Sequence, residues 1–195
     1  GAQVPDENGA GIRQEGADLT VKHCYFHDNE NGILGGAGEV VIESSEFANN
    51  GFGDGQSHNI YIGERTRRFT LRASYSHHAN VGHAVKSRAE ENRILYNRLS
   101  DESTGASSYL IDLPDGGLAY VIGNVIQQGP LTENTTLLSY GAEGPRHGKT
   151  GLYVVNNTFV NDHDTGVFIR NANAAYPAKV VNNIFAGPGK IVVGP

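Results

Sequence analysis

The chain contains no methionine, no tryptophan and only one cysteine among its 195 residues. Cys24 has no partner within the chain, so a small fold held together by disulfides is excluded. The sequence also lacks any run of about 18 apolar residues, the length that a transmembrane helix needs. It has no basic start followed by an apolar stretch either. We therefore expect no membrane-spanning segment and no membrane partner.

Basic residues are scarce as well. Fifteen Lys and Arg stand against 21 Asp and Glu, which gives a formal net charge of −6. A general nucleic-acid binder normally carries a basic excess, so we expect no nucleic-acid partner. Glycine, in contrast, is abundant at 26 residues, and the hydrophobic content of 38% is that of a folded globular protein. This composition indicates a turn-rich, all-β chain.

One pattern recurs seven times: an apolar residue, a few variable ones, a small polar residue, one more, and then in most copies an apolar or aromatic residue. The copies are "VKHCYF", "IESSEF", "LRASYS", "LYNRL", "VIGNVI", "VVNNTF" and "VVNNIF". We call their small polar residues the anchors: Cys24, Ser45, Ser74, Asn97, Asn124, Asn157 and Asn183. The anchors are 21 to 33 residues apart, which is too irregular for a helical solenoid and typical of β-coils with variable loops.

A second short strand is expected after each anchor except the last: "NGILGG", "HNIYIGE", "GHAVKSRA", "SYLIDLP", "TLLSYG" and "TGVFIRN". Two short strands per repeat, separated by Gly, Asn and Asp turns, form one coil of a parallel β-helix. We predict an all-β fold, a right-handed parallel β-helix (a single-stranded β-solenoid) of about seven coils. Residues 1–195 form one domain, compatible with a fragment that lacks flanking coils or caps.

Consecutive coils of such a fold lie about 4.8 Å apart, so the anchors are expected to stack and to hydrogen-bond from coil to coil. The apolar residue two positions after each anchor is expected to form a core column. Its members are Phe26, Phe47, Leu99, Ile126, Phe159 and Phe185. Ser76 interrupts this column.

These repeats resemble, over residues 11–194, those of the right-handed parallel β-helix superfamily, which includes the pectate-lyase-like proteins. The segments "NGAGIR", "HDNENGI", "HNIYIG" and "GHAVKSRA" are similar to those of secreted bacterial members that are described mostly by their fold. The resemblance implies this fold and a secreted, periplasmic or extracellular location. It implies no single activity, because the scaffold carries lyases, hydrolases, epimerases and adhesins.

Stacking of the second strands predicts two outward columns, since side chains alternate along a strand. One column is Leu34, Tyr61, Lys86, Leu110, Leu138 and Phe168. The other is Gly36, Gly63, Arg88, Asp112, Tyr140 and Arg170. This register pairs Arg88 with Asp112 and leaves Lys86 without a carboxylate. Lys86 is thus the first candidate for catalysis, with solvated surface as the alternative interpretation.

Histidines gather in the same region, with four of them within 26 residues. His58 and His83 precede adjacent strands at matching positions and are predicted to stack. His77 and His78 lie in the turn between. Such a group can move protons, but no spacing matches a zinc signature, and no metal ligands are assigned. "HDNENG" and "NNGFGDG" look like acidic calcium loops, which leaves calcium open as a cofactor, although such runs are mostly turn chemistry.

The first functional hypothesis is an enzyme acting on an acidic polysaccharide, a lyase that cleaves uronate-containing glycans by β-elimination. That reaction needs a base and a cation that neutralises the developing enolate. The catalytic candidates are Lys86 as base and Arg88 as clamp, with Tyr61 or His83 at the leaving oxygen. The substrate-binding candidates are His58, Asp112, Tyr140 and Arg170.

The pairing of Lys86 with Arg88 is similar to that of alginate lyases and chondroitinase-B-type lyases, in which Lys acts as base and Arg as acid. In that family the two residues come from different coils, whereas here they share one strand. The acidic trio of that family's calcium site has no counterpart in this sequence.

The second hypothesis is a non-catalytic β-solenoid that binds glycans or assembles end to end. "NGAGIRQEG" already resembles a coil near the start, and the sequence ends on "KIVVGP" without a capping helix. Open coil ends are unpaired sheet edges, which offer a route to a homo-oligomer.

Overall fold

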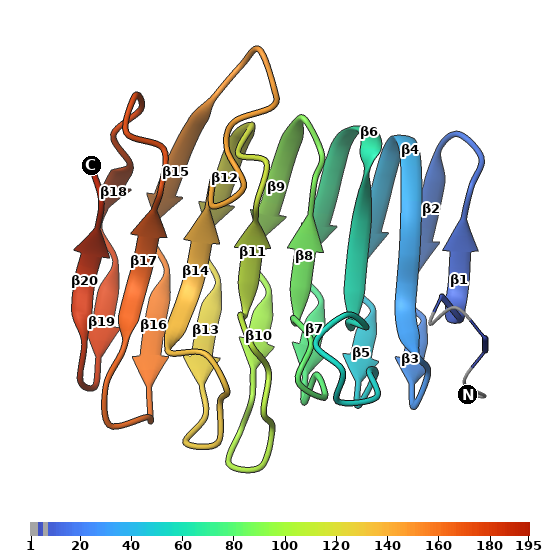
Figure 1. Ribbon diagram of the computed structural model, residues 1–195, viewed down its shortest axis with the longest axis horizontal. Coiled ribbons are helices and arrows are strands. Elements are labelled where there is room, and N and C mark those ends of the chain that lie inside the picture. The colour runs from blue at the N-terminus through green and yellow to red at the C-terminus, as the bar shows by residue number, and fades with distance from the viewer. Residues whose placement is uncertain (1–3, 6–7) are drawn as a thin grey trace.

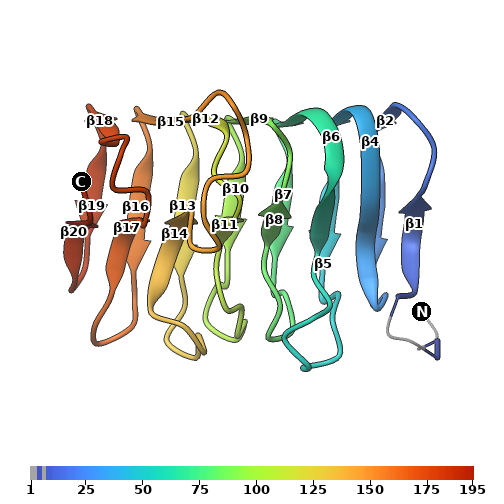
Figure 2. The ribbon, with the colours of Figure 1, turned by 45° about the horizontal axis from the view of Figure 1, so that its top comes forward.

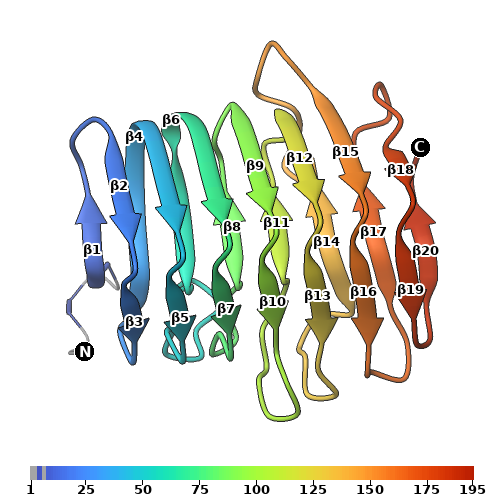
Figure 3. The same ribbon diagram turned by 180° about the vertical axis from the view of Figure 1, so that it is seen from behind.

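The computed structural model describes residues 4–5 and 8–195, and within them the chain is a parallel β-solenoid of about six turns without a helix. Figures 1 and 3 show the coils stacked side by side along one axis, with β1 (Ala10–Gln14) and β20 (Lys190–Val193) at opposite ends of the stack. The predicted all-β, parallel, coiled architecture is therefore confirmed. No helix of the described residues is long and apolar enough to cross a membrane.

The larger sheet has 13 strands. They are β1 (Ala10–Gln14), β2 (Leu19–Lys22), β4 (Asn31–Glu43), β6 (Ile60–Arg72), β8 (Val85–Ser87), β9 (Glu91–Leu95), β11 (Ile111–Leu113), β12 (Leu118–Ile122), β14 (Thr136–Tyr140), β15 (Gly151–Val155), β17 (Val167–Asn171), β18 (Lys179–Val181) and β20 (Lys190–Val193). Strand β6 is long enough to pair with β8 through its first residues and with β9 through its last ones. The sheet therefore has two arms. We call the arm formed by β1, the first parts of β4 and β6, and β8, β11, β14, β17 and β20 the site face (Figure 1).

The smaller sheet has seven strands, one for each copy of the repeat. They are β3 (Tyr25–His27), β5 (Glu46–Ala48), β7 (Tyr75–His77), β10 (Arg98–Ser100), β13 (Val125–Gln128), β16 (Thr158–Asn161) and β19 (Ile184–Ala186). Each begins directly after its anchor. Figure 3, which views the molecule from behind, shows them in one row in front of the site face.

The anchors form a continuous ladder along the stack. From Cys24 to Asn157, the backbone N–H of each anchor donates to the side-chain oxygen of the next anchor at 2.8 to 3.2 Å. The residue before each anchor has a left-handed backbone with φ between 49° and 70°, which turns the chain sharply into the smaller sheet. The predicted stacking of the anchors is confirmed.

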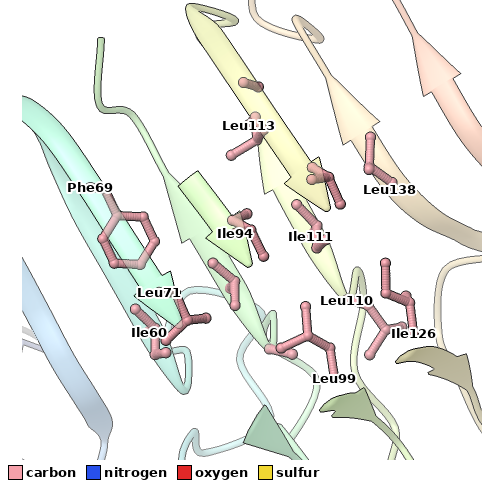
Figure 4. Close-up of a cluster of buried hydrophobic side chains, with 14 of the residues drawn as sticks. Ile60, Phe69, Leu71, Ile94, Leu99, Leu110, Ile111, Leu113, Ile126 and Leu138 are labelled. Carbon is pink, nitrogen blue, oxygen red and sulfur yellow. The ribbon is translucent and has the colours of Figure 1, made fainter. Parts of the chain in front are cut away.

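The core column also lies in the predicted register. Phe26 stacks on Phe47 with ring centroids 5.0 Å apart, and Phe159 stacks on Phe185 at 5.2 Å. Figure 4 shows the central part of this core, where Leu99 and Ile126 face the buried residues of the larger sheet. Ser76 interrupts the column as predicted, and its hydroxyl is satisfied by Asn59 Nδ2 at 3.1 Å and the Ala84 carbonyl at 2.9 Å.

We expect Asn124→Ala to lower the free energy of unfolding by about 2–4 kcal/mol, measured by urea denaturation. Asn124 Oδ1 accepts from both the backbone and the side-chain N–H of Asn97 at 2.8 and 3.0 Å. Its own amide donates to the Ile94 carbonyl and to Asn157. The substitution leaves buried donors without partners, which costs more than an average hydrogen bond contributes.

Asn182→Gly is the matched control, because Asn182 is exposed in the turn position before an anchor with φ of 54°. Glycine adopts this conformation without strain, so the control is expected to change stability by less than about 0.5 kcal/mol. Equal losses in both variants would show that the ladder contributes nothing specific.

Candidate functional site

One outward column of the site face carries half of the predicted site residues. Backbone pairing places Tyr61 of β6 beside Lys86 of β8, and Lys86 beside Asp112 of β11. Asp112 in turn pairs with Ser139 of β14, which pairs with Arg170 of β17. We call these five residues the strip. It runs along the axis of the solenoid, across five neighbouring coils.

Two predictions from the sequence are wrong: that Arg88 pairs with Asp112, and that Lys86 has no carboxylate beside it. Val85 pairs with Ile111 rather than with Tyr109, so the strand lies two residues from the predicted register and Asp112 reaches Lys86. A shift of two residues keeps Asp112 on its predicted outward face. Alternation therefore could not reveal it.

The outward orientation predicted for Tyr140, Leu110, Leu138 and Phe168 is also wrong, since all four are packed in the hydrophobic core. All five residues of β14 are buried, so its sequence carries no alternation that would set its orientation. Tyr140 turns inward, where its hydroxyl donates to the Gly117 carbonyl at 2.5 Å and accepts from the Gly151 N–H at 3.1 Å. A surface role in substrate binding does not fit this position.

Lys86, Asp112 and His83 form a compact cluster. Asp112 Oδ2 lies 3.7 Å from Lys86 Nζ and 3.5 Å from His83 Nε2. The Asp112 side chain is 6% exposed and that of Lys86 is 17% exposed. Lys86 is therefore the member that solvent reaches most easily.

Burial raises the pKa of Asp112 to about 6. The ammonium of Lys86 and the guanidinium of Arg88 oppose this rise, whereas the carboxylate of Glu143 adds to it. A carboxyl group with such a pKa exchanges protons near neutral pH, as a general acid or base must.

His58 and His83 stack as predicted, with ring centroids 4.6 Å apart and an interplanar angle of 22°. The backbone N–H of His83 donates to His58 Nδ1 at 3.1 Å, so the proton of neutral His58 is on Nε2. Burial, with Lys86 and Arg88 nearby, lowers the pKa of His58 to about 3. Burial and the neighbouring His58 lower the pKa of His83 well below its usual value. Both rings are therefore neutral at pH 7.

The other two histidines do not join this pair. His77 lies on β7 of the smaller sheet, where its Nε2 is 3.2 Å from Glu46, and His78 follows it. Among the described residues, no three His, Cys, Asp or Glu side chains are grouped so that they could hold a metal ion. In the calcium-like segment "NNGFGDG", Asp54 accepts from the N–H groups of Gln56 and Ser57, which is turn chemistry.

Tyr61 joins the cluster to a second group of charges. Its ring lies 5.7 Å from Lys86 Nζ and meets the His58 ring edge-on at 5.5 Å. Its hydroxyl oxygen accepts from Arg88 Nε at 3.1 Å.

Arg88 is held by two carboxylates that sequence analysis missed. Its Nη1 donates to Asp115 at 2.7 Å, and Nη1 and Nη2 each donate to one oxygen of Glu143 at 2.9 Å. These contacts, above all the one with Glu143, raise the pKa of Arg88. Glu143 is 55 residues away in sequence on a long loop, so no local pattern could indicate it.

An open pocket of about 410 Å³ lies beside this group. Gly35, Gly36 and Gly63 contribute backbone without side chains, and Tyr61 and Arg88 border it. The remaining lining residues are Glu64, Arg65, Glu143 and Arg146.

No protein-family model matches the chain, and no significant match exists among curated proteins or solved structures. Only the geometry of the site therefore bears on its function.

We expect acid to destabilise the fold through His58. The folded-state pKa of His58, about 3, lies below its unfolded value of 6.5. The stability that neutral His58 contributes to the fold is therefore complete above pH 6.5 and is lost as the pH falls towards 3. The variant His58→Asn keeps an acceptor near the position of Nδ1 but has no ring that can be protonated. In this pH window its free energy of unfolding should fall with decreasing pH less steeply than that of the wild type, by about 1.4 kcal/mol per pH unit. Urea denaturation at several pH values measures both slopes.

His23→Asn is the control, since His23 is exposed. Its pH profile should follow that of the wild type. Parallel profiles for all three proteins would refute the neutral state inferred for His58.

Proposed function

We propose that the protein acts on an acidic polysaccharide, as a lyase that cleaves uronate-containing chains by β-elimination. The observation that carries the proposal is the position of Asp112, a buried carboxyl 3.7 Å from Lys86 and 3.5 Å from His83 on an outward column. Ionisable groups with shifted pKa values cluster at functional sites more often than elsewhere.

The proposed reaction begins with transfer of a proton from Lys86 to Asp112. The neutral amine of Lys86 then takes the proton on the carbon next to the uronate carboxylate. The electron pair of that C–H bond forms a C=C bond as the glycosidic C–O bond breaks. Lys86 is the base because it is more exposed than Asp112.

Tyr61 donates a proton to the departing oxygen in this scheme. Its oxygen accepts the N–H of Arg88, so its own hydroxyl proton remains available. Asp112 then releases its proton to solvent, through His83 or a water molecule, and Tyr61 takes up a proton from solvent. All three groups are then in their starting protonation states. Arg88 stabilises negative charge on the Tyr61 oxygen.

The shape of the strip supports an extended substrate. Lys86 and Arg170 are three coils apart, which corresponds to roughly 14 Å along the axis. At this separation from the base Lys86, Arg170 suits a second carboxylate further along a linear acidic glycan. The proposal includes membership of the pectate-lyase-like superfamily and secretion, since a glycan of this kind is an extracellular substrate.

A second candidate is glycan binding without turnover. Asp115, Glu143 and Tyr61 together engage Nε, Nη1 and Nη2 of Arg88, so this cation is not free to stabilise an enolate as the structure stands. In that case the strip would bind the glycan without cleaving its glycosidic bonds.

The test is incubation with alginate, pectate and glycosaminoglycans while the absorbance of unsaturated products is followed. We expect product from at least one substrate, and a loss of at least about 100-fold in kcat for Lys86→Met and Asp112→Asn. Both variants should remain folded in thermal unfolding.

Lys22→Ala is the matched control, because Lys22 is exposed and pairs with Glu43 on the other arm of the larger sheet. Its activity should equal that of the wild type. Binding of these glycans without any product would favour the second candidate, and full activity of Lys86→Met would remove Lys86 from the mechanism.

A further inference from the structure

The pocket beside Tyr61 is lined by three guanidinium groups, those of Arg65, Arg88 and Arg146. Three carboxylates balance them. Glu64 and Glu143 line the pocket, and the buried Asp115 lies 2.7 Å from Arg88 and 3.5 Å from Arg146. The group is therefore neutral only while Glu143 is present. Without that carboxylate it would carry one positive charge.

Glu143 meets Arg88 in the geometry by which arginine recognises a carboxylate ligand. The two carboxylate oxygens each accept from a different Nη at 2.9 Å, an end-on, two-point contact that lysine cannot make. The Glu143 side chain is 42% exposed, whereas that of Arg88 is 15% exposed. The ligand-like partner is thus on the solvent side of the contact.

The backbone of Glu143 is held independently of its side chain. The N–H groups of Gly141, Glu143 and Arg146 donate to the carbonyls of residues 113, 114 and 115 at 2.9 to 3.0 Å. Figure 2 shows the loop after β14 folding back towards β11. Rotation of the Glu143 side chain therefore does not require the loop to detach.

Arg88 keeps its place when Glu143 leaves. Its Nε remains bonded to Tyr61 and its Nη1 to Asp115. The two Nη groups that Glu143 occupies would then point an organised fork at the pocket. Such preorganisation lowers the cost of binding a carboxylate.

We propose that Arg88 and this pocket form a carboxylate-binding subsite for an acidic sugar, and that Glu143 occupies it as an internal substitute until the substrate displaces it. This inference rests on the proposed function, because it assigns a place to one uronate carboxylate next to Tyr61. It also explains how Arg88 can bind a substrate although Glu143 already contacts it. Exchange of one carboxylate for another conserves both the charge and the hydrogen bonds at Arg88. Free Glu143 then lies in solvent, where an ionised carboxylate is stable.

The test compares Glu143→Gln with Glu64→Gln by calorimetric titration with a galacturonate tetrasaccharide. Both substitutions remove one negative charge from the pocket, but only Glu143 contacts Arg88. We expect about tenfold tighter binding for Glu143→Gln, and a smaller tightening of about twofold to threefold for Glu64→Gln, which removes the same charge but frees no Nη group of Arg88. Equal tightening in both variants, unchanged or weaker binding in Glu143→Gln, or no binding in either, would overturn the inference.

A second substitution tests the fork. Arg88→Lys in the Glu143→Gln background should return the affinity to that of the wild type or below, because lysine has no two-point geometry. Thermal unfolding confirms that this variant is folded. A neutral oligosaccharide of the same length should bind all variants equally.

The readout also separates this inference from the proposed lyase activity. Tighter binding in Glu143→Gln without any unsaturated product keeps the subsite and rejects the lyase. Product formation without selective tightening in Glu143→Gln keeps the lyase and rejects the subsite.

Discussion

The coil-to-coil hydrogen bonding of the anchors is the constraint on which the rest of the structure depends. A parallel solenoid has no helix to hold its turns in place, so each coil must be aligned by bonds to its neighbours. The anchors supply them through side-chain oxygens that accept from the preceding coil's backbone. Because these polar groups are buried, a displaced coil would leave several of them unpaired, which makes other alignments costly.

This alignment determines which side chains meet on the site face. Lys86 and Asp112 belong to different coils and come together only because β8 and β11 pair in a particular register. The burial of Asp112 is unfavourable for its charged form, and Lys86 partly offsets it. The same burial produces a carboxyl group that can exchange protons near neutral pH, so the fold tolerates a local cost at the place where chemistry is proposed.

The cluster of Lys86, Asp112 and His83 lies close enough to the charges around Arg88 for each to affect the other electrostatically. Glu143 raises the pKa of Asp112, whereas Arg88 and Lys86 lower it. Displacement of Glu143 by a substrate carboxylate would therefore keep a negative charge near Asp112. Tyr61 contacts members of both groups, so a ligand bound in the pocket and a proton moved at Lys86 would meet at one side chain.

The architecture could be predicted from the repeat, because the information that sets it is local and recurs in each coil. The seven copies of the repeat carried the anchors, the aromatic column and its interruption at Ser76, and each is found where the pattern predicts. The stacked pair of His58 and His83 could be predicted for the same reason, since both occupy equivalent positions in successive repeats.

The electrostatic partners could not be predicted, because they depend on how segments far apart in the sequence pack together. The alternation of side chains along a strand shows only on which face a side chain lies, so it could not distinguish registers two residues apart. The prediction therefore paired Asp112 with Arg88 and not with Lys86. In β14, where both faces are buried, it could not orient Tyr140 at all. The contact between Glu143 and Arg88 spans 55 residues and depends on a loop that folds back across neighbouring coils, a path that no spacing in the sequence encodes.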